Sequence, residues 1–143
     1  MKKIVIAALA TVAFAASAAE VTVSAARDYQ GQHADGYRVA TQVAGLGLSA
    51  THIDNRYNRF AVGKDVQLTK VGPVAVSAGV AGVYQATNTS VGVDGYGLTV
   101  GTKASYAVTK SVDLVAGVER FYGQDRIKQF NGNVGTVGLN VKF

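Results

Sequence analysis

The sequence predicts an all-β fold, an eight-stranded antiparallel transmembrane β-barrel of the up-and-down type. The first observation is that apolar and polar residues alternate with a period of two in eight segments, as in strands with two different faces. The second is a composition of 17 Gly and a single Pro, without apolar residues at helical spacing over several turns. The third is an alternation of long and short connections, as in membrane barrels with long outer loops.

Residues 1–19 are predicted to form a cleaved secretory signal peptide ahead of one barrel domain, residues 20–143. Lys2 and Lys3 supply the positive start, residues 4–14 the apolar core, and residues 16–19 the small side chains of a cleavage site. Cleavage after Ala18 and cleavage after Ala19 fit this pattern equally well. The apolar core is shorter than the ~18 residues of a spanning helix, which argues against a membrane anchor.

Charge and cysteine content exclude several classes of function. Removing Lys2 and Lys3 leaves 12 basic against 9 acidic side chains, so the net charge falls from +5 to +3. This weak basicity and the export signal argue against a nucleic-acid partner. The absence of Cys excludes disulfides, thiolate metal sites and thiol nucleophiles. The pairs Asp54-Asn55 and Asp94-Gly95 are typical of turns before they are typical of calcium sites, and no metal or cofactor is expected.

The first four expected strands cover residues 21–29, 37–43, 46–53 and 59–69. Each carries apolar side chains on one face and mostly polar or small side chains on the other. The alternation changes phase near Gly45 and Gly47, so the register of the second and third strands stays open. Lys64 falls on the apolar face of the fourth strand, and either a bulge there or a side chain that reaches an interface would resolve this.

The last four expected strands cover residues 74–85, 96–108, 112–122 and 133–143. The eighth places Val137, Leu139 and Val141 on one face and ends the chain with the aromatic Phe143. Loops are expected at residues 30–36, 54–58, 86–95 and 123–132, and tight turns at residues 44–45, 70–73 and 109–111.

The aromatic residues and the polarity of the two faces favour a membrane over water. Six aromatic residues are expected at the loop ends of their strands, like the interfacial girdle of a membrane barrel. They are Tyr29, Tyr37, Phe60, Tyr84, Tyr96 and Tyr122. An eight-stranded barrel has room inside for its inward side chains, which here are small, polar or charged. The large apolar face must then point outward, where a bilayer would stabilise it.

With this pattern and its terminal Phe143, the mature chain resembles the small bacterial outer-membrane barrels, namely the OmpA transmembrane domain, OmpX and the opacity-type porin-like proteins. The resemblance implies a Gram-negative outer-membrane location and a polar, largely plugged interior. It also implies that Phe143 is the assembly signal read by the barrel-assembly machinery. We expect a monomer in contact with outer-membrane lipid and lipopolysaccharide.

Six inward charges are expected to form a polar network in the barrel lumen, because buried charges need partners. They are Arg38, Asp65, Lys103, Asp113, Glu119 and Lys142. Neighbouring strands at similar heights suggest the pairs Lys103–Glu119 and Asp113–Lys142. Such a network either plugs the barrel or lines a narrow, gated ion path.

Five basic residues are expected at the loop end of the barrel, where the outer leaflet carries lipopolysaccharide phosphates. They are Arg56, Arg59, Arg120, Arg126 and Lys128. One interpretation is contact with lipopolysaccharide, and the other is solubility of the loops.

Residues for catalysis are scarce. Lipid A-modifying barrel enzymes use His and Ser with an acidic partner, but this chain has only His33 and His52. His52 lacks the nearby Ser of the lipid A deacylase motif, and Ser49, His52 and Asp54 would need a fortunate geometry. We therefore expect no enzyme but a structural or surface-interacting barrel, with a narrow pore as one version. The alternatives are a lipid A-modifying enzyme and a soluble periplasmic barrel that binds a ligand.

Overall fold

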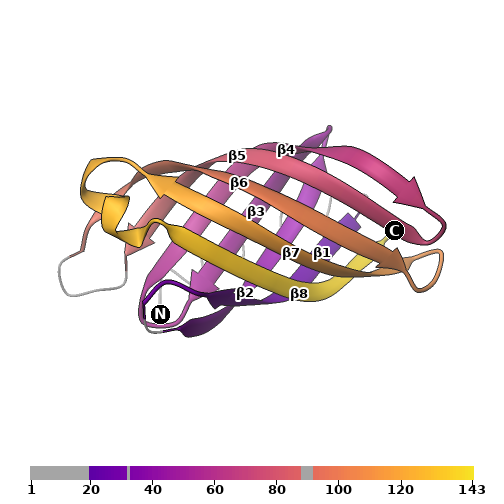
Figure 1. The fold of residues 1–143 in the computed structure, drawn as a ribbon, viewed down its shortest axis with the longest axis horizontal. Coiled ribbons are helices and arrows are strands. Elements are labelled where there is room, and N and C mark those ends of the chain that lie inside the picture. The colour runs from indigo at the N-terminus through magenta and orange to yellow at the C-terminus, as the bar shows by residue number, and fades with distance from the viewer. Residues whose placement is uncertain (1–19, 32, 88–91) are drawn as a thin grey trace.

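The computed structural model describes residues 20–31, 33–87 and 92–143, and the expected signal peptide lies outside this part of the chain. The strands form one closed antiparallel barrel in chain order, in which β8 pairs with β1 (Figure 1). Their bounds are β1 Glu20–Asp28, β2 Ala34–Val43, β3 Leu46–Ile53, β4 Tyr57–Val71, β5 Val74–Thr87, β6 Asp94–Ala107, β7 Val112–Gly123 and β8 Gly132–Lys142. The predicted eight-stranded fold is confirmed. One 3-10 helix, η1 (Asp125–Phe130), precedes β8, and no helix among the described residues is long and apolar enough to cross a membrane.

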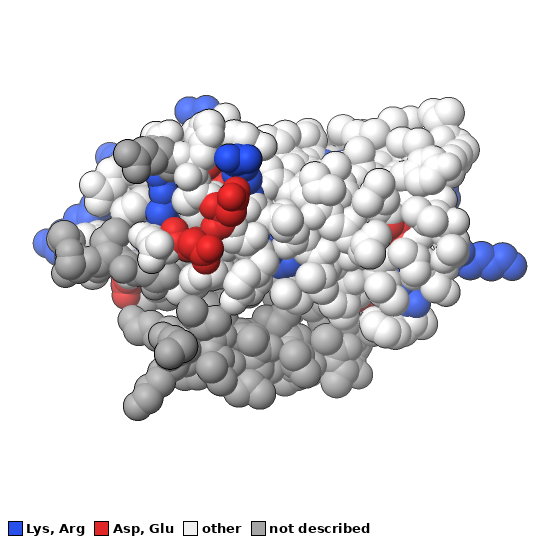
Figure 2. All heavy atoms as spheres, turned by 90° about the horizontal axis from the view of Figure 1, so that it is seen from below, with Lys and Arg blue, Asp and Glu red and all other residues white. Residues whose placement is uncertain are grey.

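The two faces of the wall carry the side chains that the alternation predicts. Along β1 and β8 the outward Val23 and Val137 are exposed, whereas the inward Ser24 and Asn140 are buried. The six aromatic residues of the expected girdle are all exposed, between 36% and 69%. Figure 2 shows one side of this surface, where most charged side chains gather toward the two ends and the middle is largely uncharged. The outer surface of the barrel is therefore apolar, and its lumen is lined mainly by small and polar side chains outside the loop end.

A two-residue turn fixes the register that the sequence left open. Ala44 and Gly45 both have positive φ, 52° and 80°, and Val43 pairs with Leu46 across them. Two positive φ values are the requirement of the tight hairpin turn whose twist matches that of the strands. The change of phase therefore lies in the turn, and the alternation continues unbroken along each strand.

Lys64 lies on the outer face without a bulge at its own position. It pairs with the outward Val80, and the ladder slips only further on, between Gln67 and Thr69. The suggestion of a bulge at Lys64 is therefore wrong, because the bulge lies a few residues further along β4. The Lys64 side chain lies on the apolar outer surface.

Two connections differ from expectation. β4 begins at Tyr57, so its connection to β3 is residues 54–56 and the loop expected at 54–58 is shorter. β4 pairs with β3 only as far as Gly63 opposite Gly47, but with β5 as far as Val71 opposite Val74. The β4–β5 hairpin thus extends beyond the β2–β3 hairpin at the turn end, toward the far right of Figure 1.

Candidate functional site in the barrel lumen

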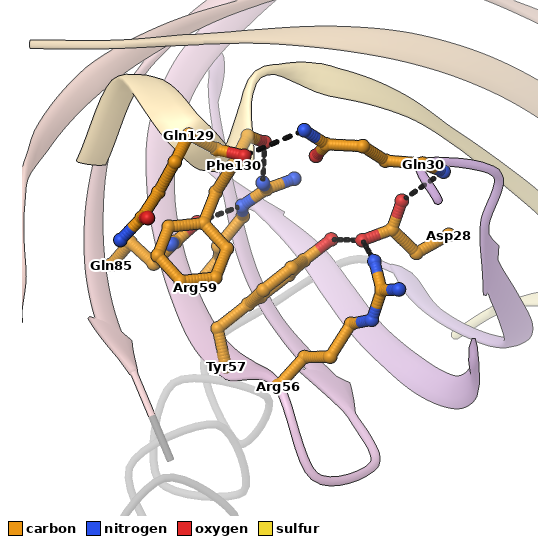
Figure 3. Close-up of polar contacts among 8 residues, drawn as sticks. All are labelled: Asp28, Gln30, Arg56, Tyr57, Arg59, Gln85, Gln129 and Phe130. Carbon is orange, nitrogen blue, oxygen red and sulfur yellow. Dashed lines mark hydrogen bonds and ion pairs between the residues drawn. The ribbon is translucent and has the colours of Figure 1, made fainter. Parts of the chain in front are cut away.

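The loop end of the lumen is closed by a layer of side chains around Arg59 (Figure 3). The guanidinium carbon lies 3.9 Å from the ring centroid of Tyr57 and 3.9 Å from that of Phe121. Nε donates a hydrogen bond to Gln85 Oε1 at 2.6 Å, and Nη2 donates one to the carbonyl oxygen of Phe130 at 3.2 Å. Arg59 is 3% exposed. Cation–π contact and charge-assisted hydrogen bonds thus replace part of the water that this charge has lost, whereas Arg59 Nη1 and Gln85 Nε2 are buried without a hydrogen-bond partner in the described part of the chain.

Asp28 of β1 joins the same layer from the opposite side. Its Oδ2 accepts hydrogen bonds from the Tyr57 hydroxyl at 2.9 Å and from Arg56 Nη1 at 3.1 Å. Its Oδ1 accepts one from the backbone N–H of Gln30 at 2.9 Å. The carboxylate therefore binds the first loop to the start of β4 (Figure 3).

The helix η1 covers this layer from above. Ile127 is fully buried and packs with Phe121 and Val83, and Phe130 packs against the same cluster. A Cβ on Gly97 would collide with the Phe121 ring, so a glycine is needed there to seat it. The layer of Tyr57, Arg59, Phe121 and Ile127, which we call the plug, fills the loop end with side chains.

The six inward charges meet in three pairs. Arg38 Nη1 lies 2.6 Å from Glu119 Oε2, Lys103 Nζ lies 2.7 Å from Asp65 Oδ2, and Lys142 Nζ lies 2.7 Å from Asp113 Oδ2. The third pair is the one suggested from the sequence. The suggested Lys103–Glu119 pair is wrong, because Arg38 reaches Glu119 across the lumen and leaves Lys103 to Asp65.

A cavity of about 150 Å³ lies on the turn side of the Arg38–Glu119 pair. Its walls are mostly small or polar and include Ser49, Ser77 and Thr99. Arg38 Nη2 also donates a hydrogen bond to Ser49 Oγ at 3.0 Å. The lumen is thus filled at the loop end and hollow below.

The five basic residues proposed for lipopolysaccharide do not form one set. Arg59 is buried in the plug and cannot contact an outer lipid, which corrects the prediction for this residue. Arg56 is bound to Asp28 at 3.1 Å. Arg120, Arg126 and Lys128 are exposed at the loop end, and the Arg120 guanidinium lies 5.6 Å from the Tyr122 ring centroid.

The histidines do not meet a serine. Ser49 faces the lumen, whereas His52 faces outward, where its Nδ1 lies 2.6 Å from Asn58 Oδ1 and its Nε2 lies 3.0 Å from Asp54 Oδ1. His33 stacks edge-on against Tyr29, with ring centroids 5.7 Å apart. The nucleophilic arrangement of Ser49 with His52 is therefore wrong. Among the described residues no group of three His, Asp or Glu side chains could hold a metal ion.

Sequence reasoning missed the plug, although a signal for part of it was present. Asp28 and Arg59 fall on the inward faces of their strands by alternation, and Phe121 follows Glu119 in the inward row of β7. When the inward-facing side chains of a strand end in a large aromatic residue, and an inward arginine lies at the same end of the barrel, a filled lumen is indicated. Ile127 lies in η1, a segment whose sequence has no such period, and gave no signal.

Comparisons with known structures agree on the fold. The N-terminal β-barrel domain of Pseudomonas aeruginosa OprF matches with a TM-score of 0.61 at 12% identity, over 88% of this chain and 98% of that domain. A de novo designed transmembrane β-barrel matches with 0.61 at 17% identity, over 88% and 97% of the two chains. Ail of Yersinia pestis, the attachment invasion locus protein, matches with 0.56 at 8% identity, over 87% and 95%. A comparison with curated protein sequences gave no match.

The sequence also matches a family model. The model is described as YfaZ precursor and covers residues 1–134, nearly the whole chain. A precursor with this outward apolar surface is an exported protein of the outer membrane. The chain belongs to the YfaZ precursor family.

Proposed function

We propose that this protein is a closed structural barrel of the outer membrane that presents a basic rim to lipopolysaccharide and does not conduct ions. The observation that carries the proposal is the plug, in which Arg59 lies between the rings of Tyr57 and Phe121. An ion entering from the loop end would have to displace this layer, and the Arg38–Glu119 pair lies beneath it. Both barriers hold a guanidinium group in contacts that are costly to break.

Conductance in planar lipid bilayers tests the closed state. The wild-type protein is expected to give no single-channel steps, whereas the double variant Arg59→Ala, Phe121→Ala removes the bulk of the plug and should give small ones. Phe60→Ala is the matched control, because Phe60 lies at the same end of β4 but faces outward. Steps in the wild type that Glu119→Gln alters would support the narrow-pore alternative instead.

The basic rim consists of Arg120, Arg126 and Lys128, which are exposed at the loop end. Guanidinium and ammonium groups bind phosphate oxygens well, and lipopolysaccharide carries phosphates at that level. Neutralising all three to Gln should lower the lipopolysaccharide that co-purifies with the protein. Lys70 and Lys110 at the turn end are the control, and an equal amount with the triple variant would refute the contact.

Assembly and processing complete the proposal. Phe143 follows β8 and is 82% exposed, so its ring is available to the barrel-assembly machinery. A barrel that closes on itself needs no second copy, which supports a monomer. Cleavage after Ala18 or Ala19 would fall just before the start of β1 at Glu20. Amino-terminal sequencing of the mature protein will distinguish cleavage after Ala18 from cleavage after Ala19.

A further inference from the structure

The turn side of the wall has a gap. β3 pairs with β4 from Ile53 opposite Tyr57 to Gly47 opposite Gly63, and no further. Beyond it, residues 64–71 of β4, with the exception of Leu68, pair with β5 alone among the described parts of the chain. We call this gap, bordered by β4 residues 64–71 and lying beyond the β2–β3 hairpin, the notch.

Lys64 stands at the head of the notch and faces outward. It is the central residue of β4, and its outward neighbours Val62 and Val66 are 53% and 58% exposed. No hydrogen bond or ion pair joins the side chain of Lys64 to another residue in the described ranges, although its backbone pairs with Val80. A lysine on the lipid face is unfavourable near the midplane of a bilayer. A lysine on this face therefore needs water or an anion within reach of its ammonium group.

The edge along the notch also resists the addition of another strand. Lys64 and Lys70 lie on it, and Leu68 is left out of the ladder where the register slips between Gln67 and Thr69. Lysines and bulges on an edge are the means by which sheets avoid pairing with a further strand. Unpaired backbone groups cannot face hydrocarbon either. These features favour water at the notch over a second copy of this chain.

The lumen cavity reaches the notch. Its walls include Gly47, Gly63, Lys64 and Asp65, where β3 stops and β4 continues. A Cβ built on Gly47 would have only the Gly63 carbonyl oxygen within 4 Å, at 3.8 Å. Asp65 is already paired with Lys103 at 2.7 Å. The cavity therefore extends to the part of β4 that carries Lys64, and the outward side chain of this lysine has no counter-ion among the residues described.

We propose that the notch is a water-filled side portal that binds the phosphate headgroup of an anionic lipid from the turn-side leaflet, with Lys64 as its counter-cation. The long stem of Lys64 can stay against Val62 and Val66 while the ammonium extends toward the headgroups. The phosphate supplies the missing charge, and water from the cavity solvates the edge. This site is at the opposite leaflet from the basic rim and does not depend on contact with lipopolysaccharide.

Thiol accessibility tests the water in the portal, because the chain has no native cysteine. Lys64→Cys is compared with Val137→Cys, the central position of β8, which also faces outward and is 59% exposed. With a charged thiol reagent on both sides of phospholipid vesicles, Lys64→Cys should react at least ~10-fold faster, since such reagents need water. Equal rates, whether fast or slow, would overturn the portal.

Native mass spectrometry with phosphatidylglycerol tests the headgroup. Lys64→Gln should lower the population with bound lipid by about fivefold, because it removes the charge-assisted contact. Lys110→Gln, which removes an exposed cation from the β6–β7 turn, should leave it unchanged. Equal retention by Lys64→Gln would overturn the site. Displacement of the lipid by inorganic phosphate would overturn the assignment to a lipid in favour of a free anion.

Discussion

At the scale of single residues, Arg59 shows how this barrel accommodates a buried charge. Its guanidinium has an aromatic ring on each face and acceptors at two of its nitrogens. A planar cation suits such a layer, whereas a lysine at this position could not reproduce it. The residue thus acts in the interior and not at the surface where its position near a loop had suggested.

Replacing Arg59 by Ala should destabilise the barrel by about 3 kcal/mol, because two cation–π contacts and two hydrogen bonds are lost together. Urea unfolding in lipid vesicles, followed by the shift in gel mobility, measures this change. Arg120→Ala is the control, since Arg120 is exposed on the outer face, and it should alter stability little. A similar loss of stability for both variants would mean that the plug contributes nothing specific to the stability of the barrel.

The charges of the lumen show which residue-level inferences the sequence allows. Alternation places Arg38, Lys103 and Glu119 inside, as the structure has them. Reasoning from neighbouring strands finds Lys142–Asp113, which join β8 to β7. It fails for Glu119, whose partner reaches across the lumen from β2. Contacts across a barrel depend on side-chain length and height, which a list of strands does not contain.

At the scale of elements, the β2–β3 hairpin carries a strained position. Ala44 has φ 52°, in the left-handed region that costs a residue with a Cβ about 1 kcal/mol. Ala44→Gly should therefore stabilise the barrel by roughly that amount, as measured by urea unfolding. Ala40→Gly, within β2, is the matched control and should destabilise it. If both glycine variants destabilise the barrel, the loss comes from the greater conformational entropy of glycine in the unfolded chain. That result would contradict the strain inferred at Ala44.

The terminal strand provides the next prediction. β8 pairs with both β7 and β1, so it is the element that closes the barrel. Deleting Phe143 should reduce the folded barrel in outer membranes several-fold by removing the proposed assembly signal. The native fold should lose little, because the ring is 82% exposed. Val141→Ala is the control, and equal yields with and without Phe143 would remove its role in assembly.

The sequence predicted the strands better than their ends. β3 matches its expected bounds, because a turn with Gly45 and a loop with Asp54 flank it. β4 extends past both expected ends, since Tyr57 continues the inward row and Lys70 and Val71 continue the hairpin. Loop signals such as Asn55 mark where a turn can form but not how many residues it takes. The short β3–β4 connection was therefore missed.

At the scale of the whole molecule, the apolar outer surface and the closed ladder predict a detergent-stable barrel. Samples extracted from outer membranes without boiling should migrate differently in gels from boiled ones. The reason is that closure leaves most backbone hydrogen bonds inside the wall, where detergent does not compete for them. The same mobility before and after boiling, with the protein in the soluble periplasmic fraction, would contradict the membrane assignment.

The plug has a consequence for the order of folding. Asp28, Tyr57 and Phe121 come from β1, β4 and β7, so their contacts can form only when distant parts of the chain have met. Contacts of such long sequence separation form late and slowly. Interactions that appear after the rate-limiting step chiefly slow unfolding. We therefore expect the layer around Arg59 to act as a latch that prolongs the lifetime of the barrel once it has closed, without hastening its insertion.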